Sequence, residues 1–157
     1  MKKQLGIIAV ALLTISCNSS VENSKTKSNR VPLEGTWKLL TGTLIEKGDT
    51  TVTDYTHGKE FIKIINDNHF AFLSHDLSKG KNADSLFSAG GGPYKLTDSS
   101  YTEHLAYCND RQWEANDFNF IISINNDTLI QKGVEKIDSL GVNRLNIERY
   151  VRIKTGQ

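Results

Sequence analysis

The sequence feature that most constrains the fold is Gly35-Thr36-Trp37, which opens the first segment with the composition of a β-strand. A glycine lets the backbone bend tightly into a strand, and a tryptophan two residues later is large enough to fill one end of a small closed barrel. Leu39 continues the same side of this strand, because side chains alternate between the two faces. We therefore assign Gly35 and Trp37 structural roles at the closed end of a barrel.

The rest of the chain alternates short β-rich segments with turns and contains no helical run of convincing length. Asn and Asp in the turns at residues 66–68 and 125–127 tolerate the left-handed backbone angles of hairpins. We expect a long irregular stretch at residues 75–92 and a longer connection at residues 134–142. The expected strands are residues 36–45, 60–65, 69–74, 93–96, 101–108, 118–124, 128–133 and 143–153, and residues 50–54 could pair back across a turn onto the first of them. This pattern of about eight strands predicts an all-β fold, an eight-stranded antiparallel up-and-down barrel with room for side chains or one small ligand.

The first 16 residues have the composition of an export signal. Lys2 and Lys3 provide a positively charged start, and residues 5–15 form an apolar run. This run is too short to span a bilayer, which takes about 20 residues. We therefore predict that residues 1–16 are a signal peptide that is removed on export.

The tetrapeptide Thr14-Ile15-Ser16-Cys17 resembles the lipobox of bacterial lipoproteins, although that family prefers leucine where Thr14 stands. The resemblance implies that Cys17 becomes the first mature residue and carries acyl chains. The protein would then be anchored to the bacterial cell envelope, at the outer membrane, without spanning it. The alternative is an ordinary secretory signal with an incidental cysteine. Residues 17–30 are predicted to be a flexible tether with a reach of roughly 20 Å.

Charge and cysteine content limit the partners and the means of stabilisation. The chain has 19 Lys and Arg against 18 Asp and Glu, so loss of Lys2 and Lys3 changes the formal charge from +1 to −1. Such a near-neutral protein lacks the basic excess that nucleic-acid binding requires. If Cys17 is lipidated, Cys108 is the one remaining thiol. The barrel domain, residues 31–157, must then be stabilised by its core without an intrachain disulfide.

Gly35-Thr36-Trp37 near the first strand, together with an arginine on the last strand, resembles the lipocalins of the calycin superfamily. In particular, the chain is similar to the short lipocalin-like lipoproteins of bacteria. The resemblance implies that the arginine of the last strand packs over the tryptophan at the closed end of the barrel. Arg149 is the candidate because it shares a strand face with Leu145, Ile147, Val151 and Ile153; Arg152, on the opposite face, is the alternative.

The strand at residues 101–108 carries the main candidates for ligand binding. Tyr101, Glu103 and Tyr107 share one strand face and, if that face points inward, Glu103 is a carboxylate inside the barrel that needs a partner or a raised pKa. Glu103, Tyr107 and Arg149 could then grip a polar group of a ligand, or Glu103 and Arg149 could form a structural ion-pair network. The alternative is that this face points outward and the opposite one, with His104 and Cys108, points inward. Two aromatic residues, Phe72 on the wall and Trp113 at the mouth, complete the candidate set.

Catalytic and metal chemistry have little support in the sequence. No Gly-x-Ser-x-Gly elbow frames a serine, and Cys108 has no identified base. His104 and Cys108 are four residues apart, which on a strand is about 13 Å and too far for one metal ion. We predict a non-catalytic protein without cofactor or metal that binds a small apolar or amphipathic molecule in its barrel. A solid barrel that contacts another envelope protein through its loops is the second hypothesis, and an enzyme that uses Glu103 is the last.

Overall fold

The computed structural model describes residues 31–83 and 85–154. The predicted signal peptide, the lipidation site at Cys17 and the tether lie outside the described residues. Within the described ranges, no helix combines the length and the apolar character that a membrane crossing demands.

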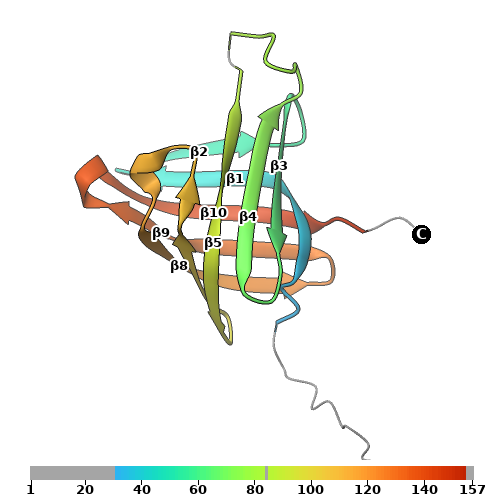
Figure 1. Cartoon of the computed structure of the whole chain (residues 1–157), viewed down its shortest axis with the longest axis vertical. Coiled ribbons are helices and arrows are strands. Elements are labelled where there is room, and N and C mark those ends of the chain that lie inside the picture. Colours follow the sequence, from blue (N-terminus) through green and yellow to red (C-terminus); the bar gives the residue numbers. More distant parts are fainter. Residues whose placement is uncertain (1–30, 84, 155–157) are drawn as a thin grey trace, which may run out of the picture.

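Eight strands form a closed antiparallel barrel, as the sequence predicts (Figure 1). They pair in the order β1, β3, β4, β5, β6, β8, β9 and β10, and β10 pairs with β1 to close the ring. β2 pairs with the second half of β1, and β7 pairs with β5 beyond the end of β6. The strands are β1 (Gly35–Glu46), β2 (Asp49–Asp54), β3 (Lys59–Ile65), β4 (His69–Asp76), β5 (Phe87–Thr97), β6 (Ser100–Leu105), β7 (Tyr107–Cys108), β8 (Asn116–Asn125), β9 (Thr128–Ile137) and β10 (Val142–Arg152), with two 3-10 turns, η1 (Arg111–Trp113) and η2 (Asp138–Leu140).

The two predicted long connections are shorter than expected, because the strands beside them continue further. β4 extends to Asp76 and β5 begins at Phe87, so the expected irregular stretch at residues 75–92 is wrong except for the described residues 77–83 and 85–86. The three glycines at residues 90–92 are part of β5. A Cβ at Gly90 would lie 2.6 Å from the Phe72 ring, and one at Gly92 would collide with the backbone of His104. Glycine here permits a close approach of strands and is not a loop signal. The second connection, likewise, is reduced to the turn η2 and Gly141.

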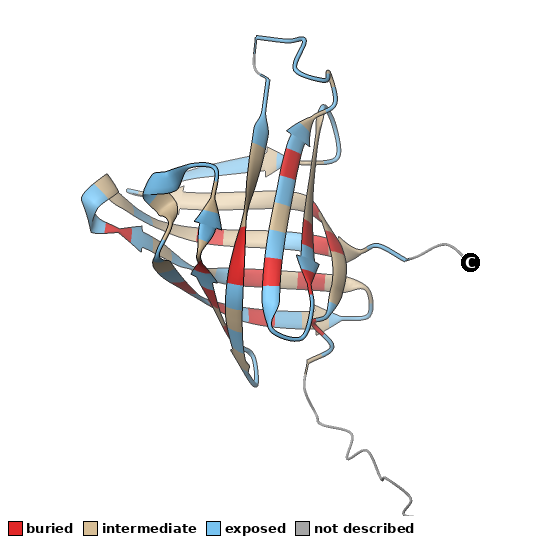
Figure 2. Cartoon of the chain, viewed as in Figure 1, coloured by how far each residue is buried: buried red, intermediate tan, exposed pale blue. Residues whose placement is uncertain are grey.

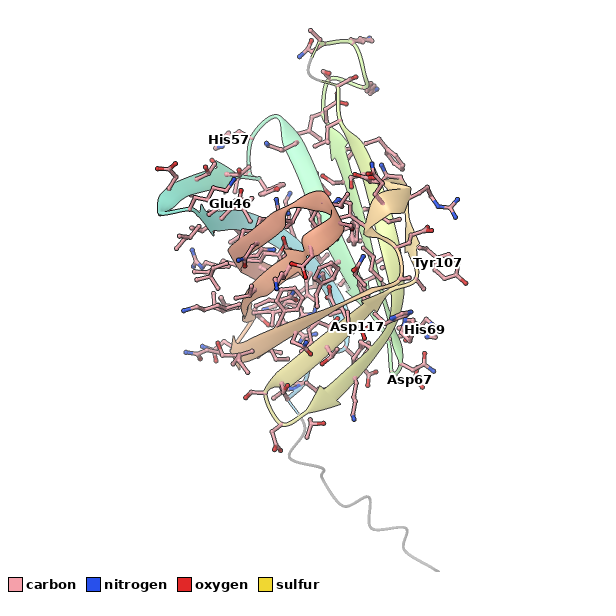
Figure 3. The ribbon with its side chains drawn as sticks, turned by 90° about the vertical axis from the view of Figure 1, so that its left-hand side faces the viewer. Glu46, His57, Asp67, His69, Tyr107 and Asp117 are labelled. Atoms are coloured by element: carbon pink, nitrogen blue, oxygen red, sulfur yellow. The ribbon has the colours of Figure 1, made fainter. Side chains whose placement is uncertain are left out.

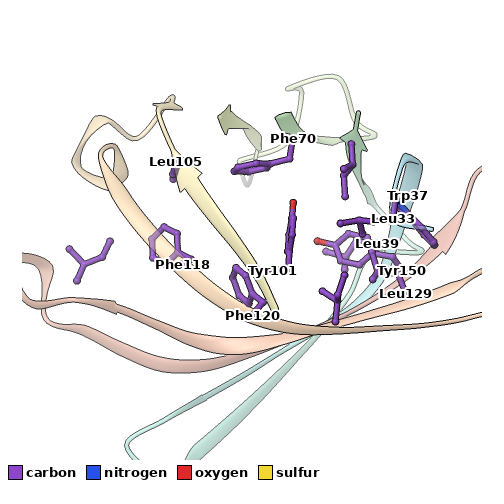
Figure 4. Close-up of a cluster of buried hydrophobic side chains, with 13 residues drawn as sticks. Leu33, Trp37, Leu39, Phe70, Tyr101, Leu105, Phe118, Phe120, Leu129 and Tyr150 are labelled. Atoms are coloured by element: carbon purple, nitrogen blue, oxygen red, sulfur yellow. The ribbon is translucent and has the colours of Figure 1, made fainter. Parts of the chain in front are cut away.

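The apolar core extends through the interior of the barrel, from Leu33 and Trp37 at one end to Leu105 and Phe118 (Figures 2 and 4). Trp37, Tyr101 and Tyr150 are completely buried, and the Trp37 indole N–H donates a hydrogen bond to the Leu33 carbonyl at 2.8 Å. The polar end of the indole is therefore satisfied inside the core. The predicted structural role of Trp37 at the closed end agrees with this position. The buried hydrophobic residues are Leu33, Trp37, Leu39, Ile65, Phe70, Tyr101, Leu105, Phe118, Phe120, Ile122, Leu129, Ile137 and Tyr150.

Arg152, and not Arg149, lies over this tryptophan. The Arg152 guanidinium is 4.0 Å from the centre of the Trp37 ring, and it donates hydrogen bonds of 2.5 Å to the carbonyls of Pro32 and Glu34. Gly35 has a φ of +138°, and a Cβ there would lie 2.5 Å from the Arg152 guanidinium. Glycine at position 35 is therefore required both for its backbone angle and for the arginine above it.

The assignment of Arg149 to the closed end was wrong because the more apolar face of β10 is its outer face. Trp37 pairs with Arg152, whereas Arg149 pairs with Thr41 beyond a bulge in β1 and is exposed. The inward face of β10 contains charged and polar side chains, and such a face is normally expected to point toward solvent. The inward residues are Val142, Arg144, Asn146, Glu148, Tyr150 and Arg152.

Candidate functional site

A cavity of about 290 Å³ occupies the end of the barrel opposite Trp37. Aromatic rings form much of its wall. Phe61 and Phe72 stack with ring centres 5.7 Å apart, and Trp113 of η1 packs against Phe118 at 5.9 Å. This volume is close to the lower limit of small-molecule sites, about 300 Å³. The lining residues are Phe61, Lys63, Phe72, Ser88, Glu103, Leu105, Cys108, Asp110, Trp113, Phe118, Phe120, Gln131, Glu135, Arg144 and Glu148.

A buried lysine is the centre of the charge network at the floor of this cavity. The ammonium of Lys63, on β3, lies 2.7 Å from the Glu103 carboxylate and 3.1 Å from the Gln131 side-chain carbonyl. It also lies 3.9 Å from Glu148, which accepts a hydrogen bond of 2.8 Å from the Tyr150 hydroxyl. The Lys63 ammonium is thus the counter-charge of two carboxylates, Glu103 on β6 and Glu148 on β10.

Burial and neighbouring charge act on this network in opposite directions. Burial raises the pKa of Glu103 above its usual range, although the Lys63 ammonium opposes this. Burial acts against the charged form of Lys63, but Glu103 and Glu148 outweigh it, and the pKa of Lys63 is raised. Lys63 therefore stays protonated, and Glu103 is the group of this pair whose protonation burial favours.

A second charge pair stands nearer the mouth. Arg144 donates a hydrogen bond of 2.7 Å to Glu135, whose other oxygen accepts one of the same length from Asn146. The Arg144 guanidinium also lies 5.1 Å from the centre of the Trp113 ring, which places a cation against the aromatic wall. Both oxygens of Glu135 are thus occupied, and this pair is neutral as a whole.

The rim around η1 is held by side-chain contacts to the backbone. Glu114 accepts hydrogen bonds from the Cys108 amide at 2.9 Å and from Arg111 at 2.8 Å. The Cys108 amide, and then Arg111, lower the pKa of Glu114. Asp110 caps the N-terminus of η1 through the Gln112 amide. These contacts fix Trp113 at the mouth of the cavity.

The structure brings three of the predicted site residues together. Glu103, Phe72 and Trp113 all line the cavity. Tyr101 points inward as well, but it is completely buried in the core, where burial and then the Glu103 charge raise its pKa. Of the two strand faces considered in the sequence analysis, the one with Tyr101 and Glu103 therefore points inward in this part of the strand.

The predicted inward placement of Tyr107 and Arg149 was wrong. Tyr107 is 72% exposed and points away from the barrel in Figure 3. The reason is an extra residue at Ala106: Leu105 faces inward, and so does Cys108 opposite Gly90, so the alternation is interrupted between them. Arg149 is exposed on the outer face of β10.

Sequence reasoning missed Lys63, Gln131, Glu135, Arg144 and Glu148, which form most of the polar lining. A weak signal exists for Lys63, because it stands between Phe61 and Ile65 at a spacing of two, on an otherwise apolar strand face. A signal of the same kind exists in β10, where Glu148 precedes Tyr150 by two residues. Nothing local indicates that these side chains meet, since Lys63 and Glu103 are 40 residues apart in the chain.

The histidines do not contribute to the cavity. His104 lies outside the barrel and pairs with Asp117 at 2.7 Å, and His57 pairs with Asp54 at 3.1 Å. Hydrogen bonds from Thr56, and then from His57, lower the pKa of Asp54 to about 2. Across residues 31–83 and 85–154, no group of three or more His, Cys, Asp or Glu side chains is arranged to hold a metal ion.

Neither the scan of protein-family models nor the search of curated proteins finds a match to this chain. The fold assignment therefore rests on the strand pairing itself, which is compatible with a lipocalin-like barrel.

Proposed function

We propose that this protein is a non-catalytic binding protein that holds one small, largely apolar ligand in its barrel. We further propose that it is a lipocalin-like lipoprotein, anchored to the bacterial outer membrane through Cys17. The observation that carries the binding proposal is the cavity of about 290 Å³ behind Trp113, with five aromatic rings in its wall. Aromatic walls with a few converging polar groups are typical of small-molecule sites. Near a membrane, such a protein would carry or sequester its ligand.

Filling the cavity is expected to abolish ligand binding. Ser88 is half-buried, and its side chain lines the cavity, so Ser88→Trp would place an indole in the ligand's space. Ser123 is exposed on β8, so Ser123→Trp is the matched control. We expect the full wild-type chain and Ser123→Trp to retain small molecules from lipid extracts in native mass spectrometry, and Ser88→Trp to retain at least about tenfold less.

Two results would contradict the binding proposal. One is equal retention by Ser88→Trp and Ser123→Trp, which would place the molecule outside the barrel. The other is a wild-type protein that retains nothing from lipid extracts and shows no rise in melting temperature with any of them. Loss of folded protein in Ser88→Trp is detected independently by circular dichroism, so a folding defect is not mistaken for a binding defect.

The second candidate is an interaction module that contacts another envelope protein. It is favoured by apolar residues exposed on the outside of the barrel, where Phe87 is 67% exposed and Leu77 is 51% exposed, at the two ends of the connection between β4 and β5. Photo-crosslinking from residues 77–86 in intact cells tests it. A discrete protein adduct supports this candidate, whereas crosslinks to lipid alone contradict it.

A further inference from the structure

The acidic groups of the cavity outnumber its basic groups. Four carboxylates face two cationic side chains: Glu103, Glu135, Glu148 and Asp110 against Lys63 and Arg144. Asp110 is exposed at the rim, where water screens it. The imbalance that matters is therefore the one at the buried floor, where Lys63 is the one ammonium beside two carboxylates.

Glu148 is the carboxylate that can accept a further hydrogen bond from a ligand. Glu135 is fully occupied by Arg144 and Asn146, and Glu103 holds Lys63 at 2.7 Å. Glu148 is further from Lys63, at 3.9 Å, and one of its oxygens accepts the Tyr150 hydroxyl. Its other oxygen receives no hydrogen bond from the part of the chain that the structure describes. Its side chain is only 15% exposed, and it lines the cavity.

A buried carboxylate without a full counter-charge is costly, and a cation brought by a ligand would remove that cost. The aromatic wall suits the rest of such a ligand, because the rings offer an apolar surface against which its body can pack. We propose, on the basis of the binding function above, that the cavity takes a small organic amine whose ammonium group contacts Glu148 and whose apolar body lies against Phe61, Phe72 and Trp113. The amine proposal thus adds a positive charge to the small, largely apolar ligand of the proposed function.

The size of the cavity sets the choice of probes. A single aromatic ring with a two- or three-atom side chain fits within about 290 Å³. The probes are 2-phenylethylamine, its uncharged analogue 2-phenylethanol, and the anion 3-phenylpropionate, which have nearly the same shape and differ in charge. Each is titrated into the full chain at neutral pH by calorimetry. Fluorescence of Trp113 reports binding at the mouth, and a Trp113→Phe variant separates its signal from that of Trp37.

We expect 2-phenylethylamine to bind at least about tenfold more tightly than 2-phenylethanol, and 3-phenylpropionate to bind most weakly. Glu148→Gln is expected to remove the preference for the amine, so that the variant binds the amine and the alcohol with similar affinity. Glu60→Gln is the control, because Glu60 carries the same charge on the outer face of β3, beside Lys38. It should retain the preference for the amine.

Equal affinity of the wild-type chain for the amine and the alcohol would overturn the amine assignment and leave ligand binding in the barrel intact. A preference for the amine that survives Glu148→Gln would also overturn it. Absence of binding by all three probes at millimolar concentration contradicts both the amine assignment and the binding function on which it rests. The comparison of probes on the wild-type chain does not depend on whether any variant folds.

Discussion

Replacing Lys63 with methionine is expected to lower the free energy of unfolding by about 3–5 kcal/mol at neutral pH. Lys63 is 3% exposed, and its ammonium is the shared counter-charge of Glu103 and Glu148. Methionine fills a similar volume but leaves two carboxylates facing each other in a buried site. Urea denaturation of the wild-type chain and of Lys63→Met, followed by circular dichroism, measures the difference.

The free energy of unfolding lost in Lys63→Met is expected to increase as the pH rises. Burial raises the pKa of Glu103 in the folded protein above its ordinary value of 4.5, so the folded state binds this proton more tightly than the unfolded state does. Without Lys63, the penalty is small below about pH 4.5 and grows as the pH rises and Glu103 must ionise. The double variant Lys63→Met/Glu103→Gln removes this charge and should recover much of the lost stability. A Lys63→Met protein within about 1 kcal/mol of wild type at pH 7 would contradict the buried network.

Replacing Trp37 with alanine is expected to cost about 3–5 kcal/mol, because it empties the centre of the closed end. The indole is completely buried, it donates to the Leu33 carbonyl, and Arg152 covers its face. Thermal and urea unfolding of Trp37→Ala measure this loss.

Trp113→Ala is the matched control at the opposite end of the barrel. Trp113 is only partly buried, and its neighbours Phe118 and Arg144 have other contacts, so we expect a loss below about 1.5 kcal/mol. This variant should instead lose affinity for ligands. If Trp37→Ala and Trp113→Ala were equally destabilising, the division between a packed end and a binding end would be wrong.

The fold could be predicted because its determinants are local. Asn- and Asp-rich turns mark the hairpins, and alternation marks the strands, so the barrel follows from residues close together in the chain. The bounds of β5 could not be predicted in this way. Gly90 and Gly92 suggest a loop by composition, yet they lie in β5, where glycine is required because Phe72 and the His104 backbone come too close for a side chain.

The candidate site was predicted less completely, because its polar residues are far apart in the chain and no local sequence pattern links them. Glu103 was found because a carboxylate stands on an aromatic strand face, but its partner Lys63 comes from a different hairpin. Tyr107 was placed inside because alternation alone cannot detect the extra residue at Ala106. Arg149 was preferred to Arg152 because apolar residues were assumed to face inward, whereas the lumen of this barrel is lined by charged residues along β10.

The misassignment of Arg149 and the missed polar lining have one physical cause. A barrel buries apolar residues where its interior is packed, and charged residues can face inward where it is hollow, provided that they are paired. The charged lining of β10 is therefore itself a sign of the cavity. Polar residues at a spacing of two on strands that close a barrel are the pattern by which such a cavity could be found in a sequence.

Chemical labelling of Cys108 tests the central claim, an accessible and acidic cavity, most directly. Cys108 lines the cavity and is partly buried; burial raises the pKa of its thiol, which slows all thiol reagents alike. The cationic 2-aminoethyl methanethiosulfonate and the anionic 2-sulfonatoethyl methanethiosulfonate are compared, with modification at Cys108 followed by peptide mass spectrometry. We predict that the cationic reagent reacts faster by at least about tenfold, relative to the ratio for a cysteine-containing model peptide, and that 2-phenylethylamine slows it. A Cys108 that resists both reagents, or that reacts without preference for the cation, would contradict the account.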